Sequence, residues 1–404
     1  MKPLVVQHAE IGPKRLQPGW ESVNTLGRMR TFTPDDFSGD DTKKVQNTID
    51  AAREHYGRAY FPWTGRPYEL EDTILIEPNQ HEDQVFLTLE GDPVWKLFEY
   101  HGPPNKSVFR TLGLKGSTLR NIGLRCFASN CYGFDVGGDA DTQSSSMNLY
   151  ENLRFQSEPR THGNTGFSIG RGGNDHSCSV LWRCTAIAVL EGRPQDPGIM
   201  DAANEAGHTG YSCVGGNNLA QAFRDCTGSG QRVLFKLAEH NGHKAGGARS
   251  VYDNCAGTGC CLGYLVDGGF GVQIRGGRWE HCGSLLVHGA SKKPGRGRGT
   301  VLLSSVTADY FYPVSGAVCG LFEPGEFIGI RSDAEFVIQA CEYQQYGSPE
   351  PLDERAVRIA STSNFEATLI WQANLGIPLP EGTQEGRRTI VQDGKPKPLK
   401  VKPG

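Results

Sequence analysis

The chain has 404 residues, and its 41 Lys and Arg side chains against 45 Asp and Glu give a net charge of −4. This balance provides no global basic field, which argues against nucleic acid as a partner. Hydrophobic residues make up 37% and aromatic residues 9%, enough for a packed core, so a disordered or fibrous chain is excluded. No apolar run approaches the ~18 to 20 residues of a membrane helix, and the N-terminus lacks the apolar stretch of a signal peptide. We therefore expect a soluble protein without a membrane partner, whether secreted after loss of a leader, virion-associated or cytoplasmic.

An N-terminal extension is expected over residues 1–32, followed by a helix at about 41–56. Asp41 or Thr42 can cap this helix, its apolar residues recur on one face, and Gly57 ends it. A short strand, a turn with Pro and a second strand at 74–76 follow.

From residue 119 onward the sequence repeats one pattern of four residues: an apolar residue, a polar residue, a turn-forming residue and a second apolar residue. The turn-forming residues are spaced 31, 31, 42, 29, 22 and 29 positions apart, and they are Asn121, Asn152, Arg183, Asp225, Asn254, Gly276 and Ser305. Asn, Asp and Gly favour such a position because they tolerate left-handed backbone. A second repeated segment, such as YGFDVGG at 132–138, lies between each turn and the next. These segments read as strands that alternate between two faces.

Two strands and a turn per repeat predict a coil of stacked parallel strands, in which each rung buries its inner face against its neighbours. A β-sandwich also has short strands at regular spacing, but identical motifs in identical order favour parallel stacking. Cys184, Cys226 and Cys255 lie inside such segments and are expected to be buried free thiols.

The pattern places the coil at residues 33–345. It fades after about residue 345, where two strand-like segments within 346–390 are expected to close the far end of the coil. A polar, Pro- and Lys-containing tail at 391–404 is expected to be flexible.

The N-terminal block carries a resemblance to a known superfamily. Gly39-Asp40-Asp41-Thr42, the helix after it and Tyr60-Phe61-Pro62 resemble the opening of pectate-lyase-like right-handed parallel β-helix proteins. The resemblance implies an all-β, single-stranded right-handed parallel β-helix with an N-terminal capping helix, and it allows a homotrimer. Its members include glycoside hydrolases, polysaccharide lyases, phage tailspike proteins and proteins without known catalysis, so it does not fix the reaction.

The segment 133–137 also resembles the strand that carries catalytic aspartates in polygalacturonases. Those enzymes have Asn-Thr-Asp before this strand, where this chain has Asn130-Cys131-Tyr132, and the aspartate pair that follows is missing. Polygalacturonase chemistry is therefore not carried over.

We call the strands formed by the second repeated segment the GF strands. If these strands line a groove, alternation directs their aromatic residues inward, namely Phe134, Phe167, Tyr211, Phe235 and Tyr264. The outward positions are then Asp135, Ser168, Ser212, Lys236 and Leu265, with Asp267 and His288 one step along. The longest insertion, 187–209, adds Asp201, Glu205 and His208 beside this face, and long loops in compact repeats are often functional.

Two kinds of chemistry fit these residues. A glycoside hydrolase needs two carboxyls across the scissile bond, and Asp201 or Glu205 could pair with Asp135, Glu239 or Asp267. A polysaccharide lyase needs a cation for a uronate and a base for its proton, for which Lys236 and His208 are candidates. The substrate-binding candidates are His162, Arg171, Arg232, His240, His288 and Trp182.

The favoured function is a carbohydrate-active enzyme that cleaves glycosidic bonds of a poly- or oligosaccharide, with hydrolysis slightly ahead of lyase chemistry. A glycan-binding or tailspike-type module without catalysis is the remaining alternative. No cysteine or histidine cluster has zinc-like spacing, so neither a metal nor another cofactor is expected.

Overall fold

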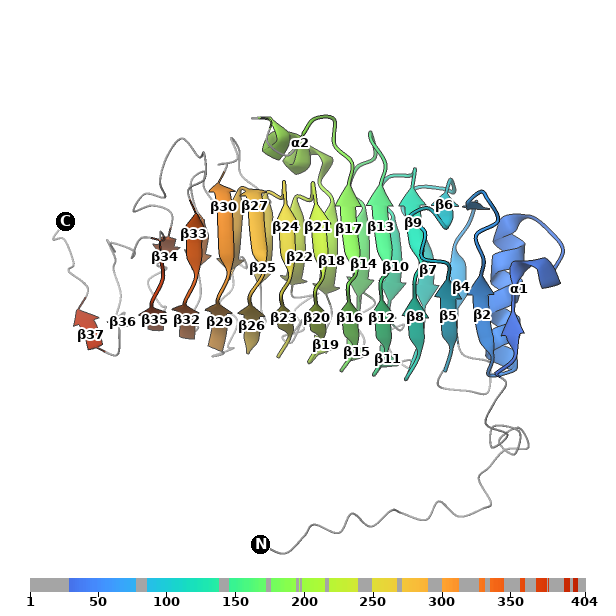
Figure 1. Ribbon diagram of the computed structural model, residues 1–404, viewed down its shortest axis with the longest axis horizontal. Helices are drawn as coiled ribbons and strands as arrows, with labels where there is room; N and C mark the ends of the chain where they lie inside the picture. Colours follow the sequence, from blue (N-terminus) through green and yellow to red (C-terminus); the bar gives the residue numbers. More distant parts are fainter. Residues whose placement is uncertain are drawn as a thin grey trace, which may run out of the picture.

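The protein is a right-handed parallel β-helix, seen in a computed structural model as strands stacked along one long axis (Figure 1). The structure describes residues 29–77, 86–137, 145–171, 176–193, 196, 198–214, 218–238, 249–266, 271–289, 300–311, 327–330, 335–344, 357–359, 368–375, 377, 389–392 and 395–398. Neither helix in these ranges is long and apolar enough to cross a membrane.

Sheet A has 14 strands and runs the length of the molecule. Its strands are β1 (Thr31–Phe32), β2 (Arg58–Phe61), β5 (Thr88–Gly91), β8 (Thr118–Arg120), β12 (Leu149–Glu151), β16 (Val180–Trp182), β20 (Ala222–Arg224), β23 (Val251–Asp253), β26 (Val272–Arg275), β29 (Thr300–Ser304), β32 (Glu335–Gln339), β35 (Thr368–Gln372), β36 (Thr389–Gln392) and β37 (Lys395–Pro398). Every neighbouring pair is parallel except β36 and β37, which are antiparallel.

Sheet B has 10 strands, and each of its later strands starts two residues after the repeated turn. They are β3 (Tyr68–Leu70), β6 (Phe98–Tyr100), β9 (Gly123–Cys126), β13 (Arg154–Ser157), β17 (Thr185–Ala188), β21 (Thr227–Ser229), β24 (Ala256–Thr258), β27 (Arg278–Cys282), β30 (Thr307–Phe311) and β33 (Glu342–Gln344). Each rung therefore has three strands, where the sequence pattern predicted two, because the turn is a single residue and its two flanking strands read as one segment.

Sheet C has 10 strands and contains the repeated GF segments. They are β4 (Ile74–Ile76), β7 (Ser107–Thr111), β10 (Tyr132–Val136), β14 (Thr165–Ile169), β18 (Thr209–Val214), β22 (Val233–Ala238), β25 (Leu262–Val266), β28 (Ser284–His288), β31 (Ile328–Ile330) and β34 (Val357–Ile359). A small fourth sheet joins β11 (Ser145–Ser146), β15 (His176–Ser177) and β19 (Asn218–Leu219).

The repeated turn has the left-handed backbone that its residues predicted. All seven turn residues have positive φ, from 51° at Asp225 to 63° at Gly276. Ala340 and Ala373 occupy the same place after β32 and β35, with φ of 52° and 50°. Rungs thus continue beyond residue 345, where alanine at the turn hid the repeat.

The core is a column of stacked rings inside the coil. The rings of Phe109, Phe134, Phe167, Tyr211, Phe235 and Tyr264 follow one another with centroids 4.8 to 5.6 Å apart. This confirms the inward positions predicted for the GF strands. A Cβ at Gly133 would lie 2.3 Å from the Phe155 ring, which explains why glycine precedes the aromatic residue there.

The helix α1 (Asp41–Glu54) lies at the N-terminal end of the stack (Figure 1). Asp40 accepts a hydrogen bond from the Lys43 N–H, so the N-cap lies one residue before Asp41, the first of the two predicted caps. Val45, Ile49 and Ala52 are buried against the first strands, as their spacing predicted. A 3-10 helix, η3 (Pro34–Asp36), precedes α1.

The eleven described cysteines are free thiols, and all but Cys178 are buried. Cys184, Cys226 and Cys255 are in the main core, as expected for small apolar side chains.

Candidate functional site

The outer face of sheet C carries a row of polar side chains in register. We call Arg110, Asp135, Ser168, Ser212 and Lys236 the polar row. Leu265 and Val287 continue it on β25 and β28 and make its far end apolar. The outward positions predicted for Asp135, Ser168, Ser212, Lys236 and Leu265 therefore share one column of the sheet.

Asp135 is held by two donors. The Ser107 hydroxyl donates to its Oδ2 at 2.6 Å, and Arg171 Nη2 contacts the same oxygen at 2.7 Å. The Arg171 guanidinium also lies over the Tyr132 ring, 4.0 Å from its centroid. Only 5% of Asp135 is exposed, so its carboxylate is desolvated and fixed in orientation. Two of the predicted residues, Asp135 and Arg171, thus form one ion pair.

The long insertion forms a helix, α2 (Ile199–Ala206), where the sequence suggested a loop. Ile199, Met200 and Ala203 pack on Val233, Leu262, Leu265 and Val287, forming a second hydrophobic cluster on the outside of sheet C. Asp201 and Glu205 lie on the exposed side of the helix, one turn apart. The helix therefore covers the apolar end of the column, and its two exposed carboxyls lie on the side of the helix that faces away from the sheet.

His208 follows α2 and is buried, with 1% of its surface exposed. Its Nδ1 accepts the Asn164 N–H at 3.1 Å. Burial, together with the charges of His162 and Arg232, lowers the pKa of His208 to about 4. His162 is exposed, and Arg232 approaches Gly207, where a Cβ would lie 3.4 Å from Nη1. The structure brings the predicted residues His162, His208 and Arg232 together at the start of β18. Of these, His208 is buried and bonded to the backbone.

Lys236 is half-buried at the end of the polar row. The outward position expected for His288 is wrong. It is in register with Val266 on the inner face, where the Phe336 ring meets it edge-on at 5.1 Å, and burial lowers its pKa to about 4. Regular alternation explains this position, because Leu286 is in register with the inward Tyr264 and Val287 with the outward Leu265, so the next residue, His288, points inward.

Trp182 lies on sheet A, where its indole N–H donates to Asp225 at 3.1 Å. Sheet A is a different face from the polar row, so Trp182 is not brought to it. Glu239, His240 and Asp267 lie outside the described residues.

A second surface, on sheet B near the N-terminal end, was not predicted. We call the pair His101 and Phe127, which follow β6 and β9, together with Trp95, which precedes β6 at the opposite end of these strands, the aromatic patch. His101 and Phe127 stack with ring centroids 4.4 Å apart, and Trp95 and Phe127 are 45% and 39% exposed. Arg154 lies 4.3 Å from the Trp95 ring centroid.

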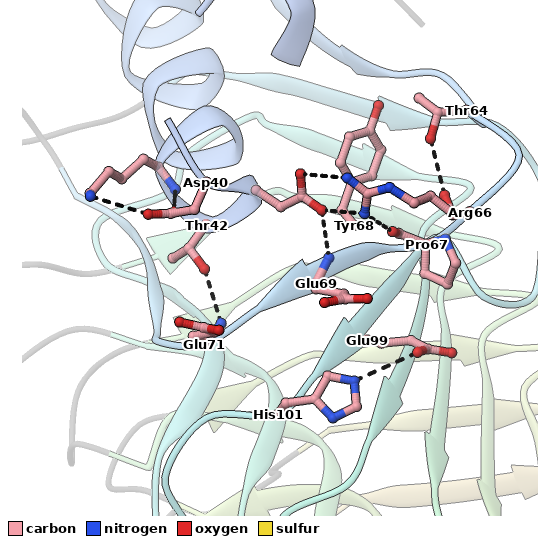
Figure 2. Close-up of polar contacts among 12 residues, drawn as sticks. Asp40, Thr42, Thr64, Arg66, Pro67, Tyr68, Glu69, Glu71, Glu99 and His101 are labelled. Atoms are coloured by element: carbon pink, nitrogen blue, oxygen red, sulfur yellow. Dashed lines mark hydrogen bonds and ion pairs between the residues drawn. The ribbon is translucent and has the colours of Figure 1, made fainter. Parts of the chain in front are cut away.

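Charged side chains adjoin this patch. Arg125 bridges two carboxylates, to Glu99 at 2.6 Å and to Glu158 at 2.7 Å, and it lies over the Phe127 ring at 4.9 Å. His101 Nε2 is 3.6 Å from Glu99, a pair drawn in Figure 2 below Arg66. Exposed rings beside carboxylates can stack on and hydrogen-bond to sugars. The available sequence signal for this patch was an aromatic residue directly after a strand, as at Phe127 after β9.

No group of three or more metal-ligating side chains is present among the described residues.

Comparisons with known proteins bear on the fold. No family model matches the chain, and no curated protein matches it. Among solved structures, ORF18 of Geobacillus virus E2 aligns with 92% of this chain at 12% identity and a TM-score of 0.48, and this chain spans 63% of that protein's length. The catalytic domain of a GH87 α-1,3-glucanase, solved as a D1068A variant with tetrasaccharides, aligns with 90% of this chain and 68% of its own at 13% identity. Its TM-score of 0.52 shows a common fold, the parallel β-helix.

Proposed function

We propose that the protein cleaves glycosidic bonds of a polymeric carbohydrate, as a glycoside hydrolase acting along the polar row of sheet C. The observation that carries the proposal is Asp135, a buried carboxylate oriented by Ser107 and Arg171 on the outer face of the sheet. A fixed carboxylate of this kind can serve as nucleophile, as base for water, or as stabiliser of an oxocarbenium-like transition state.

Hydrolysis also needs a proton donor. Asp201 and Glu205 are the proposed donors, because α2 sits on the strands that follow the polar row. Lys236 and Ser212, at the edge of α2, are proposed to bind substrate hydroxyls between the two groups. The GH87 glucanase shares the fold, which supports α-1,3-glucan as the first substrate to test.

Lyase chemistry is the less favoured reaction. One of its two predicted bases, His208, is buried and accepts a backbone N–H, and the cation Arg171 is already paired with Asp135. Lys236 remains the base on which that alternative depends.

The test follows reducing ends and the absorbance of a C4–C5 double bond on a panel of neutral and uronic polysaccharides, α-1,3-glucan included. Asp135→Asn is expected to lower the rate of reducing-end release by about 100-fold or more. Glu342→Gln, on the outer face of sheet B, is the matched control and should keep full activity. Release of reducing ends that is unchanged in Asp135→Asn would overturn the assignment of Asp135. A matching rise in double-bond absorbance would identify a lyase instead.

A second candidate, glycan binding without cleavage, is favoured by the aromatic patch. Phe127→Ala and Trp95→Ala should each weaken binding of a soluble glycan by about 3- to 10-fold, the value of one ring contact. Binding that these variants weaken, together with no cleavage of any polymer, would replace the hydrolase proposal by this one.

A further inference from the structure

The outer face of sheet A carries charges in an unusual order. Seven strands in sequence, β5 to β26, place one residue each in a single column that we call the charged column: Glu90, Arg120, Glu151, Trp182, Arg224, Asp253 and Arg275. The signs along it run minus, plus, minus, neutral, plus, minus, plus. Reading it backwards from Arg275 reverses every sign, with Trp182 as the centre.

An aliphatic column runs parallel to the charged column, two residues earlier on each strand. Its central members are Leu149, Val180, Ala222 and Val251, continued on one side by Thr118. All five are half-buried, so four apolar side chains and one threonine form a continuous stripe that water partly reaches. The two described α-helices pack elsewhere, α1 on the first strands and α2 on sheet C.

A two-fold axis explains both columns at once. Suppose that a second copy faces sheet A and that the two-fold axis lies in the plane of contact, parallel to the strands, at Trp182. The rungs of the second copy then run in the opposite order, and each column faces the same column of the other copy. Glu151 then meets Arg224 of the partner subunit, and Arg120 meets its Asp253. In the aliphatic column Val180 meets its own copy, and Leu149 meets Ala222.

Of the four charges nearest the centre of the column, all but Arg120 are available for such contacts. Glu90 is already paired within the chain, to Arg58 at 2.7 Å and Arg120 at 2.6 Å. Among the described residues, Glu151, Arg224 and Asp253 form no ion pair, although neighbours in the column have opposite charge. Four central contacts between copies, two Glu151–Arg224 and two Arg120–Asp253, therefore have opposite signs, and none has like signs.

The size of the contact sets its strength. Seven strands at about 4.8 Å spacing give an overlap of roughly 30 Å along the stack. A face this long and one strand-length wide falls at the low end of specific interfaces, where complexes are transient. We expect a dissociation constant in the micromolar range, on the order of 1 to 100 μM.

We propose that two copies of this protein associate face to face through sheet A, with their long axes antiparallel and Trp182 on the two-fold axis. The contact leaves the outer faces of sheets B and C open, so both candidate glycan surfaces stay accessible in the dimer. The interface also differs from the threefold arrangement that the superfamily resemblance allows.

Mixing two charge variants tests this geometry. In Glu151→Arg alone, the new arginine meets Arg224 of the other copy, and in Arg224→Glu alone, two glutamates meet. Each variant by itself should weaken dimerisation at least 10-fold in sedimentation velocity between 1 and 200 μM. An equimolar mixture should restore dimers. In a mixed dimer the introduced arginine of one copy meets the introduced glutamate of the other, and the unaltered Glu151 meets the unaltered Arg224.

Two controls keep the result interpretable. Glu342→Arg makes the same charge change on the outer face of sheet B and should dimerise like the unaltered protein. Circular dichroism of each single variant tests its fold, and rescue in the mixture itself requires folded copies. A monomeric or trimeric unaltered protein over this range, or variants that stay monomeric when mixed, would overturn the proposal.

Discussion

Single residues at the repeated turn help to hold successive rungs together. Asn152 has φ of 51°, and its side-chain amide donates to the Asn121 Oδ1 of the previous rung at 2.8 Å. Asn254 donates to Asp225 in the same way at 2.7 Å. The turn therefore links rungs through side chains as well as through the strands on either side.

Replacement of Asn152 should show both effects. Asn152→Ala loses the hydrogen bond to Asn121 and keeps a Cβ in the left-handed region, and we expect a loss of about 1 to 3 kcal/mol in unfolding free energy. Asn152→Gly loses the hydrogen bond but tolerates the backbone, so it should cost less than the alanine variant. Denaturant titration measures the difference, and equal losses in the two variants would show that the backbone conformation is not strained.

Three buried histidines are expected to make the protein acid-sensitive. Burial lowers the pKa of His176, His208 and His288 to about 4, below the usual 6.5. The unfolded chain then binds more protons than the folded one below pH 6.5, so stability is full above 6.5 and falls as pH drops toward 4. Each histidine accounts for about 3 kcal/mol at the acid end. His288→Leu should flatten the pH dependence of the unfolding free energy measured by denaturant titration.

At the scale of elements, α2 is a separate unit docked on sheet C. Its contact surface belongs to the second hydrophobic cluster, distinct from the ring column inside the coil. Ala203→Asp places a charge where the side chain is fully buried, and we expect it to release the helix while the coil stays folded.

Hydrogen exchange measures that release directly. Amides of residues 199–206 should exchange faster in Ala203→Asp, with protection in β14 and β16 retained. Asn204→Asp puts the same charge at a half-exposed position of the helix and serves as the matched control. If the coil loses protection together with the helix, the two hydrophobic clusters form one cooperative unit.

The sequence predicted those elements whose signal is local. Helix α1 has a cap, one apolar face and a terminating glycine, and the GF strands repeat one aromatic position, so both were found. Helix α2 was missed because its eight residues are short and interrupt a repeat of strands. The aromatic patch was missed because Trp95 and Phe127 come from different rungs, and only the coil brings them to one face. The ion pair of Asp135 with Arg171 depends on a contact between two rungs, which spacing alone does not reveal.

On the scale of the whole molecule, three sheets give three different outer faces around one continuous core. Sheet C offers the polar row, sheet B the aromatic patch, and sheet A the charged and aliphatic columns. Because each rung buries its inner face only against its neighbours, these faces share one source of stability, the stacked rings. A cavity among the stacked rings should therefore destabilise all three faces.

Phe235 is the position where this coupling is strongest. It is fully buried, and its ring contacts Tyr211, Phe223, Tyr252, Tyr264 and Trp279. Phe235→Ala leaves a cavity among these five rings and should lower the unfolding free energy by about 3 to 5 kcal/mol. Lys236→Ala, the next residue on the outer face, should change it by less than about 1 kcal/mol. Tryptophan fluorescence and circular dichroism should shift to lower denaturant together, as expected for one cooperative core. Separate transitions by the two probes would mean that rungs on either side of Phe235 unfold independently.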